Sequence, residues 1–190
     1  MVIVNKNLPP IENSSKTQRS GTLPTYLKAD KILDHLVGKG KTLDFGAGLG
    51  LSQSELNYDT FEPYPKGSFK PTYTEVLAID PSSYKRIALL NVLNVVPPDV
   101  RDNIVNSVGK ILCVDGVAVV TTRGRDVLTA KGTLGQETMS IITTINTYQK
   151  GFTQVELTNY LSATLGPSYK VQPIKLGPAG CTITKLKEGV

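Results

Sequence analysis

The chain has 190 residues, a formal net charge of +5 and a pI near 9.1. Its length suits one domain with a substantial core, and its 39% apolar and 19% charged residues are ordinary for a globular protein. No apolar run is long enough to span a membrane. The basic balance is compatible with nucleic acid or another anionic partner, although the Lys and Arg residues are scattered along the chain.

The amino-terminal residues and the cysteines bear on location and metal binding. The start "MVIVNKNLPPIENSSKTQ" has neither the charged opening nor the long apolar stretch of a secretory signal. Cys113 and Cys181 lie in apolar patterns and are expected to be small buried residues, which favours a reducing, cytoplasmic setting. With one histidine and no cysteine cluster, the sequence predicts no metal site.

The first half of the chain alternates between helical and strand patterns. Residues 1–23 are polar and predict an irregular arm, so residues 24–190 are expected to form the single domain. "LPTYLKADKILDHLVGKGK" has apolar residues at helical spacing, with Pro24 near its start and Gly38 past its end. A strand is predicted at "KTLDF", a brief helix at "LGLSQSEL", a second strand at "YDTFEP" and a third at "TEVLAID".

The second half continues this alternation. The unbroken apolar run "RIALLNVLNVV" predicts a strand that is buried on both faces. A helix is predicted over "PPDVRDNIVNSVGKILCVDG" and a strand at "VAVVTTR". A long polar stretch starts at Gly124, and its later part is predicted to be helical. An amphipathic helix, "TQVELTNYLSATLG", precedes two strands joined by a Gly/Pro turn in "YKVQPIKLGPAGCTITKLK".

Together these elements predict an α/β fold. Strands that alternate with helices form a mainly parallel sheet, because each crossover helix returns the chain to the same edge. The sequence predicts seven strands, helices on both faces of the sheet, and a C-terminal antiparallel hairpin.

The glycine cluster in "TLDFGAGLG" predicts a ligand-binding turn between a strand and a helix. A phosphate-binding P-loop is disfavoured, because Leu51 rather than Lys follows the last glycine. The spacing of Gly46, Gly48 and Gly50 also differs from the dinucleotide pattern G-x-G-x-x-G. The remaining signal is the acid Asp44 before the first glycine.

"LDFGAGLG" resembles the first motif of class I S-adenosylmethionine-dependent methyltransferases, and similarity continues over most of residues 24–187. The resemblance implies a Rossmann-like fold and S-adenosylmethionine as cofactor. It also implies that Asp44 and the loop backbone hold the methionine moiety, while Glu62 accepts hydrogen bonds from the ribose hydroxyls. The segment between Gly50 and Glu62 is short for this family, and the turn "CVDG" has one glycine where two are common.

Three further stretches, "NVLNVVPP", "TTRGRDV" and "TYQKGFTQVEL", resemble poorly characterised methyltransferase-like proteins that are borne by phages and genomic islands. Some of those proteins accompany DNA phosphorothioation systems. This second resemblance, together with the basic charge, makes nucleic acid one expected methyl acceptor.

The resemblance implies a set of cofactor-binding residues: Asp44, Phe45, Gly46, Ala47, Gly48, Gly50, Glu62, Pro63, Ile79, Asp80, Asn91 and Val92. Some of them have a second interpretation. Glu62 could be a solvated charge at a strand end, and Asp80 could be an ordinary turn aspartate rather than a contact to the adenine amino group. Asn91 and Asn94 could each line the cofactor or substrate pocket or form a structural amide bridge.

Four residues are candidates for the acceptor side: Asn94, Arg123, Arg125 and Tyr148. The two arginines could bind an anionic substrate or be loop charges. Tyr148, Lys131 and Lys150 lie in a connection long enough to be a lid.

The motifs of two DNA methyltransferase classes are missing. The amino-methyltransferase motif places Asn directly before Pro-Pro-aromatic, whereas two valines separate Asn94 from the prolines and Asp99 replaces the aromatic residue. Neither cysteine is placed for cytosine C5 chemistry. His35 has the pattern of an exposed helical residue.

The sequence therefore predicts an S-adenosylmethionine-dependent methyltransferase that works by aligning its acceptor and excluding water, with no assigned catalytic base. The acceptor is left open between a nucleic acid, a small molecule and a protein side chain, and the oligomeric state is also open. A non-catalytic cofactor-binding or accessory scaffold is the alternative, because fold does not establish function.

Overall fold

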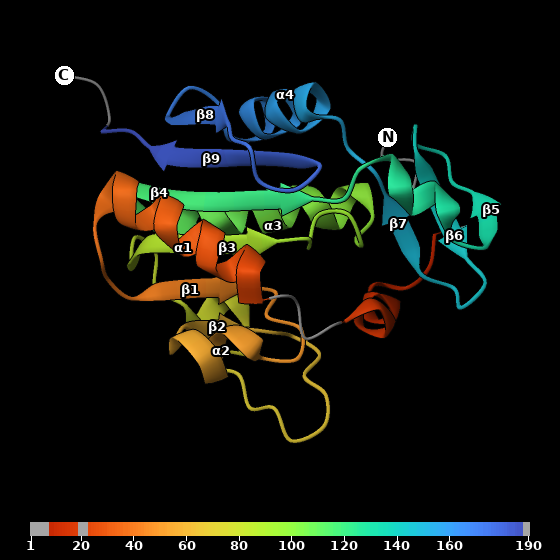
Figure 1. Ribbon diagram of the computed structural model, residues 1–190, viewed down its shortest axis with the longest axis horizontal. Helices are drawn as coiled ribbons and strands as arrows, with labels where there is room; N and C mark the ends of the chain where they lie inside the picture. Colours follow the sequence, from red (N-terminus) through yellow and green to blue (C-terminus); the bar gives the residue numbers. More distant parts are fainter. Residues whose placement is uncertain (1–7, 19–22, 188–190) are drawn as a thin grey trace.

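Figure 1 shows the computed structural model, which describes residues 8–18 and 23–187. The elements follow one another as η1 Ile11–Thr17, α1 Leu23–Val37, β1 Thr42–Phe45, α2 Leu51–Leu56, β2 Asp59–Phe61, η2 Val76–Ala78, β3 Tyr84–Leu90, α3 Pro98–Ile111, β4 Leu112–Thr122, η3 Arg125–Thr129, β5 Gly132–Leu134, β6 Ser140–Thr143, β7 Tyr148–Lys150, α4 Gln154–Leu165, β8 Tyr169–Pro173 and β9 Ala179–Lys185. Among these residues, no helix combines the length and apolarity needed to cross a membrane.

The central sheet has six strands in the order β2-β1-β3-β4-β9-β8 (Figure 1). The first four strands in this order run parallel, and β9 pairs antiparallel with both β4 and β8. The predicted α/β fold with a C-terminal antiparallel hairpin is therefore confirmed. The predicted number of seven strands is wrong by one.

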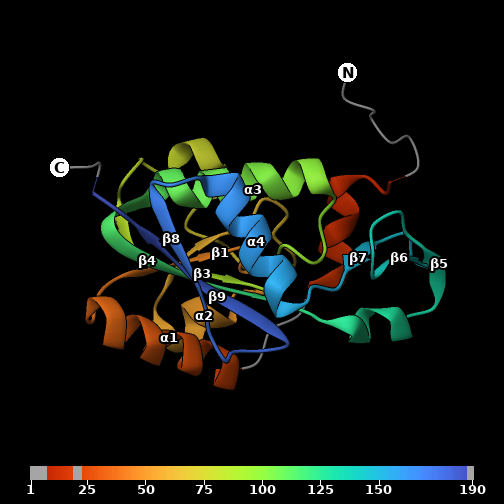
Figure 2. The ribbon, with the colours of Figure 1, turned by 90° about the horizontal axis from the view of Figure 1, so that it is seen from above.

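Helices cover both faces of this sheet, with α1 and α2 on one side and α3 and α4 on the other (Figure 2). Successive residues of β4 point to opposite faces, as in any strand. Ala118 and Val120 pack in the larger core with α3 and α4, whereas Val117 and Val119 pack with α1. This arrangement explains why the central strands are apolar at consecutive positions.

The predicted third strand at residues 74–80 does not form. A single bridge, between Phe61 and Tyr73, lies just before this segment, which then forms the short 3-10 turn η2. The neighbouring strand β2 has only three residues and offers a short edge for pairing. In this turn Ile79 enters the core, while Leu77 stays 94% exposed. A short apolar run is therefore compatible with a turn as well as with a strand.

Two predicted boundaries also change. β3 ends at Leu90, six residues before the end of its apolar run, because Asn91 adopts the left-handed conformation at φ 58°. The predicted helix over residues 97–116 ends at Ile111. The Asp-Gly pair that was expected to stop it lies within β4, where Asp115 has φ 60° and the pairing with β3 shifts register.

The connection between β4 and α4 folds as a three-stranded antiparallel sheet, β5-β6-β7, preceded by η3. We call β5, β6 and β7 the inserted sheet. The predicted helix in this stretch is wrong, because the β-branched residues of "SIITTINTY" suit paired strands. Asn146 supplies the left-handed turn at φ 57°, and the Thr143 and Thr147 hydroxyls lie 2.7 Å apart across it.

The described part of the arm lies beside the inserted sheet, as the red segment in Figures 1 and 2 shows. Lys16 Nζ donates to the carbonyl of Ile145 at 3.4 Å. On its other side, the Lys66 ammonium donates to the carbonyl of Ser15 at 2.5 Å. η1 therefore bridges the loop after β2 and the inserted sheet.

Candidate functional site

A cavity of about 510 Å³ opens at the carboxyl ends of β1, β2 and β3. This edge of an open α/β sheet is where ligands generally bind. The walls come from the turns after these three strands, from one side of α3 and from the arm. The lining residues include apolar side chains such as Phe45, Phe61, Val76 and Ile104, together with a few polar groups. That combination is typical of small-molecule and cofactor sites.

The glycine turn and the second strand meet through paired phenylalanines. Phe45 and Phe61 are register partners on parallel strands, and their ring centroids are 4.5 Å apart. Gly46 N then donates to the carbonyl of Phe61 at 2.8 Å. Gly46 has φ +89°, and a Cβ on it would come within 2.5 Å of Val92 Cγ2. Close approach of the turns after β1 and β3 therefore requires glycine here.

Glu62 follows β2 directly and lines the cavity. Its carboxylate accepts hydrogen bonds from Gly48 N at 2.9 Å and from Tyr64 N at 3.1 Å. Burial raises the pKa of this carboxyl above its ordinary value, and the two backbone donors offset part of that rise. Because a carboxylate has about four lone-pair sites, it can still accept from a ligand.

Asp44 lies behind the cavity wall rather than in it. Its Oδ2 accepts from the Tyr26 hydroxyl at 2.8 Å and from Ser52 Oγ at 2.5 Å, and it is Tyr26 that lines the cavity. Asp44 Oδ1 is buried without a hydrogen-bond partner. Burial raises the pKa of Asp44 to about 6, against the lowering effect of its two hydrogen bonds.

Eight of the twelve residues predicted to bind the cofactor line the cavity: Phe45, Gly46, Ala47, Gly48, Glu62, Pro63, Asn91 and Val92. Besides Asp44, the other three lie outside it. A Cβ on Gly50 would overlap the Phe69 ring, so packing accounts for that glycine. Ile79 is buried in the core, and Asp80 lies in an exposed turn where its carbonyl accepts from Ser83 Oγ at 2.6 Å.

On the acceptor side, Asn94 and Arg123 line the cavity, whereas Arg125 and Tyr148 do not. Arg123 is paired with Asp126 at 2.6 Å and is partly exposed. Arg125 is exposed on η3. Tyr148 lies on β7, and its hydroxyl donates to Glu137 in the connection between β5 and β6.

Lys131 and His35, which the sequence analysis also considered, are exposed and lie outside the cavity. Within residues 8–18 and 23–187, no three His, Cys, Asp or Glu side chains gather in a way that could hold a metal ion.

The cavity has two walls that the motifs did not indicate. One is the arm, which contributes Ile11, Ser14, Ser15, Thr17 and Gln18. The arm shows no periodic pattern, so nothing in the sequence could have placed it here. The other is a face of α3 formed by Val100, Asn103, Ile104 and Ser107. Their spacing of three and four residues puts them on one side of a helix, so the sequence alone could have placed them on a common face.

Neither a protein-family model nor a curated protein matches the sequence. Solved structures do match the fold. One is the 1,6-didemethyltoxoflavin-N1-methyltransferase of Burkholderia thailandensis with bound 1,6-didemethyltoxoflavin and S-adenosylhomocysteine, with a TM-score of 0.58, 17% identity, and coverage of 86% of this chain and 79% of that one. The DhpI complex with SAH has a TM-score of 0.60 and 14% identity, over 94% and 98% of the two chains.

A third structural neighbour is the sugar N-methyltransferase KedS8 from Streptoalloteichus, with a TM-score of 0.61, 10% identity, and coverage of 98% of this chain and 97% of the other. The fold is that of class I S-adenosylmethionine-dependent methyltransferases. At these identities the comparison establishes the fold, and the chemistry of this chain has to be argued from its own cavity.

Proposed function

We propose that the protein is an S-adenosylmethionine-dependent methyltransferase that binds its cofactor in the cavity at the carboxyl ends of β1–β3. The observation that carries this proposal is the buried contact between Glu62 and Gly48 N at 2.9 Å. It puts a carboxylate and a glycine-turn backbone at one edge of the same cavity. The S-adenosylhomocysteine bound to structural neighbours supports the choice of ligand.

The residues present fit this cofactor. Glu62 is a desolvated acceptor that suits two adjacent ribose hydroxyls, and the backbone of Gly46–Gly48 suits the polar methionine end. The Phe45 and Phe61 rings supply apolar walls. Asp44 would act from behind, by holding Tyr26 in place. Ile79 and Asp80 lie outside the lining, so the proposal gives them no direct contact.

The cofactor supplies a methyl group that is already activated by a sulfonium. The protein then has to hold an electron-rich acceptor in line with that methyl group and to exclude water, and both effects contribute to rate without a strong base. The apolar lining and the covering arm suit this task. We therefore assign no acid–base residue to the reaction.

We propose a small molecule as the acceptor. The arm lines the outer side of the cavity and is fastened at both of its flanks, through Lys66 and Ile145, so a duplex would have to displace it. A cavity of about 510 Å³ falls within the roughly 300–1,000 Å³ of pockets for small ligands. Two of the neighbours act on small molecules, namely a didemethyltoxoflavin and a sugar.

Nucleic acid is the competing acceptor, favoured by the net charge of +5 and by the resemblance to phage-borne proteins, on which the comparisons do not bear. The competing role for the whole chain is a non-catalytic scaffold. That role is favoured by Asp44 and Asp80, two predicted ligand-binding acids that do not line the cavity. A cytoplasmic location remains an inference from the two free cysteines.

The proposal is tested by calorimetric titration of the protein with S-adenosylmethionine and S-adenosylhomocysteine. Glu62→Gln should weaken binding about tenfold or more, since a charged hydrogen-bond partner contributes roughly 1.5–3 kcal/mol. Glu55→Gln, on the exposed face of α2, is the matched control and should leave affinity unchanged. If the folded wild type binds neither compound, the protein is not a methyltransferase and the scaffold role gains support.

A further inference from the structure

We propose that Asn94 orients the methyl acceptor, through a hydrogen bond that its amide oxygen accepts from the attacking N–H or O–H group, and that the inserted sheet sets the position of Asn94. This inference rests on the proposed methyltransferase function. It adds to that function a specificity-determining residue and a requirement on the substrate, which must be a small molecule that reacts through a nitrogen or oxygen bearing a proton.

Asn94 is an unusual residue for its position. Its side chain is 1% exposed and lines the cavity, yet its Oδ1 has no hydrogen-bond partner. A buried acceptor without a hydrogen-bond partner is unfavourable, and a donor on a ligand would remove that cost. The terminal torsion of an asparagine side chain is broad, so the amide can turn toward a donor that enters the cavity. A polar group with this unmet requirement is a natural contact for a substrate proton.

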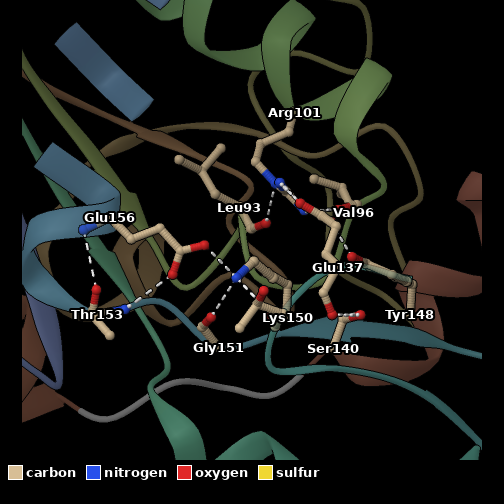
Figure 3. Close-up of polar contacts among 11 residues, drawn as sticks. Leu93, Val96, Arg101, Glu137, Ser140, Tyr148, Lys150, Gly151, Thr153 and Glu156 are labelled. Carbon is tan, nitrogen blue, oxygen red and sulfur yellow. Dashed lines mark hydrogen bonds and ion pairs between the residues drawn. The ribbon is translucent and has the colours of Figure 1, made fainter. Parts of the chain in front are cut away.

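The backbone on both sides of Asn94 is held by Arg101, which lies on α3 (Figure 3). Arg101 Nε donates to the carbonyl of Leu93 at 3.1 Å, and its Nη2 donates to the carbonyl of Val96 at 3.2 Å. The same guanidinium binds both oxygens of Glu137, at 3.0 and 2.9 Å. Arg101 is 3% exposed, so these bonds lie in a desolvated setting.

Glu137 is in turn fixed by the inserted sheet, because it accepts from the hydroxyl of Tyr148, the first residue of β7 (Figure 3). A second link is direct. Lys150 N, at the end of β7, donates to the carbonyl of Asn94 at 2.8 Å. The buried Lys150 ammonium holds this strand end through the carbonyls of Thr138 and Gly151 and the carboxylate of Glu156. Every backbone carbonyl named here around Asn94 is therefore held by α3 or by the inserted sheet.

The chemistry balances without a base on the protein. The lone pair of the acceptor nitrogen or oxygen forms the new bond to the methyl carbon, and the carbon–sulfur bond breaks with its electrons left on sulfur. The proton that the methylated group then releases passes to water. The Asn94 amide does not take this proton. It fixes the direction of the N–H or O–H bond, and hence of the lone pair.

The test uses the protein saturated with S-adenosylhomocysteine and three matched pairs of small probes: aniline and N,N-dimethylaniline, phenol and anisole, and imidazole and N-methylimidazole. Within each pair, methyl replaces every donor hydrogen: two hydrogens in aniline and one each in phenol and imidazole. Saturation-transfer NMR measures their dissociation constants. We expect the donor-bearing member to bind at least fivefold more tightly in at least one pair. Asn94→Leu should abolish this preference while the affinity for S-adenosylhomocysteine changes less than threefold.

Asn94→Asp is the companion variant, because it keeps an acceptor oxygen and should keep the preference even if Asn94→Leu folds poorly. Arg101→Lys keeps the charge but loses the planar fork, so it should reduce the preference, whereas Arg125→Lys on the exposed η3 should not. The inference is overturned if no probe binds, if no pair shows a preference, or if the preference survives in Asn94→Leu. If the wild type does not bind S-adenosylhomocysteine, that result would instead overturn the proposed function.

Discussion

Phe45 and Phe61 end two neighbouring parallel strands at the same level, and their rings lie 4.5 Å apart. Gly46 and Glu62 are the next residues on each strand, so the glycine turn and the acid leave the sheet side by side. This pairing of β1 with β2 explains why Glu62 lies beside the glycine turn although only eleven residues separate it from Gly50. α2 is short, with six residues, but the position of Glu62 is set by the strand pairing rather than by that helix.

The close approach of the turns after β1 and β3 gives the first prediction. Gly46→Ala should lower the free energy of unfolding by about 2–4 kcal/mol, because the new methyl group meets Val92 and the residue has φ +89°. Gly38→Ala is the control. Gly38 also has a positive φ, of +77°, but a Cβ on it would meet no other atom within 4 Å. It should cost only about 1 kcal/mol. Equal costs in urea unfolding would show that the contact with Val92 does not matter.

Asp44 gives a prediction for the pH dependence of stability. Burial raises its pKa from an ordinary value of 3.8 to about 6 in the folded protein, so the folded state retains a proton that the unfolded chain releases. The contribution of Asp44 to the free energy of unfolding should therefore fall as the pH rises from about 4 to 6. Above pH 6 it should be flat, after a total loss of about 3 kcal/mol.

Denaturant unfolding of the wild type and Asp44→Asn over pH 4–7 measures this contribution, because the asparagine does not titrate. The free-energy difference between them should shift against the wild type with rising pH. Asp126→Asn, at a largely exposed position on η3, controls for general charge effects. A difference that stays constant, or that moves in favour of the wild type, would contradict a buried carboxyl with a raised pKa.

Glu137 should show the opposite pH dependence. Burial alone would raise its pKa, but hydrogen bonds and charge from Arg101 hold the pKa below its ordinary value. Its contribution to stability is then present above about pH 4.5 and is lost as the pH falls below that value. Glu137→Gln should cost about 1–3 kcal/mol near pH 7 and much less near pH 3. Chemical denaturation at the two pH values checks this, and an equal cost at both would exclude an ion pair with Arg101.

The arm should matter for ligand affinity more than for stability. Four residues of η1 line the cavity, yet η1 has no fully buried residue. We expect deletion of residues 1–18 to weaken S-adenosylhomocysteine binding by about tenfold and to change the melting temperature by only a few degrees. Calorimetry and thermal unfolding measure the two effects. Unchanged affinity in the deletion variant would mean that the arm does not cover the bound ligand.

The sequence predicted the fold and the glycine turn well, because both depend on local patterns. Apolar residues at consecutive positions in β4 reflect burial on two faces, and Asp44 with its glycines marks the turn after β1. The predictions that were wrong concern features that depend on residues distant in the sequence. Whether residues 74–80 pair as a strand is decided by the short edge of β2, and Asp44 is kept from the cavity by Tyr26, eighteen positions earlier in the chain.

The inserted sheet was missed for the same reason. Its strands have three or four residues each, too few for a periodic signal, and they are held through Arg101, a residue on another element. Asn94 attracted attention as a polar residue in an apolar run, but its unpaired oxygen is visible only in three dimensions. Arg101 gave no such signal, because a single arginine in an amphipathic helix is normally a surface residue.

The fork of Arg101 also limits how this protein could be redesigned. One guanidinium serves the loop that carries Asn94, the carboxylate of Glu137 and, at 5.1 Å, the face of the Phe152 ring. Exchanging the inserted sheet for another loop, as an engineer would to change substrate preference, leaves a buried cation without its anion unless the graft brings a carboxylate to the same place. The insertion and α3 are therefore one module for engineering, although a sequence boundary at Gly124 would cut them apart.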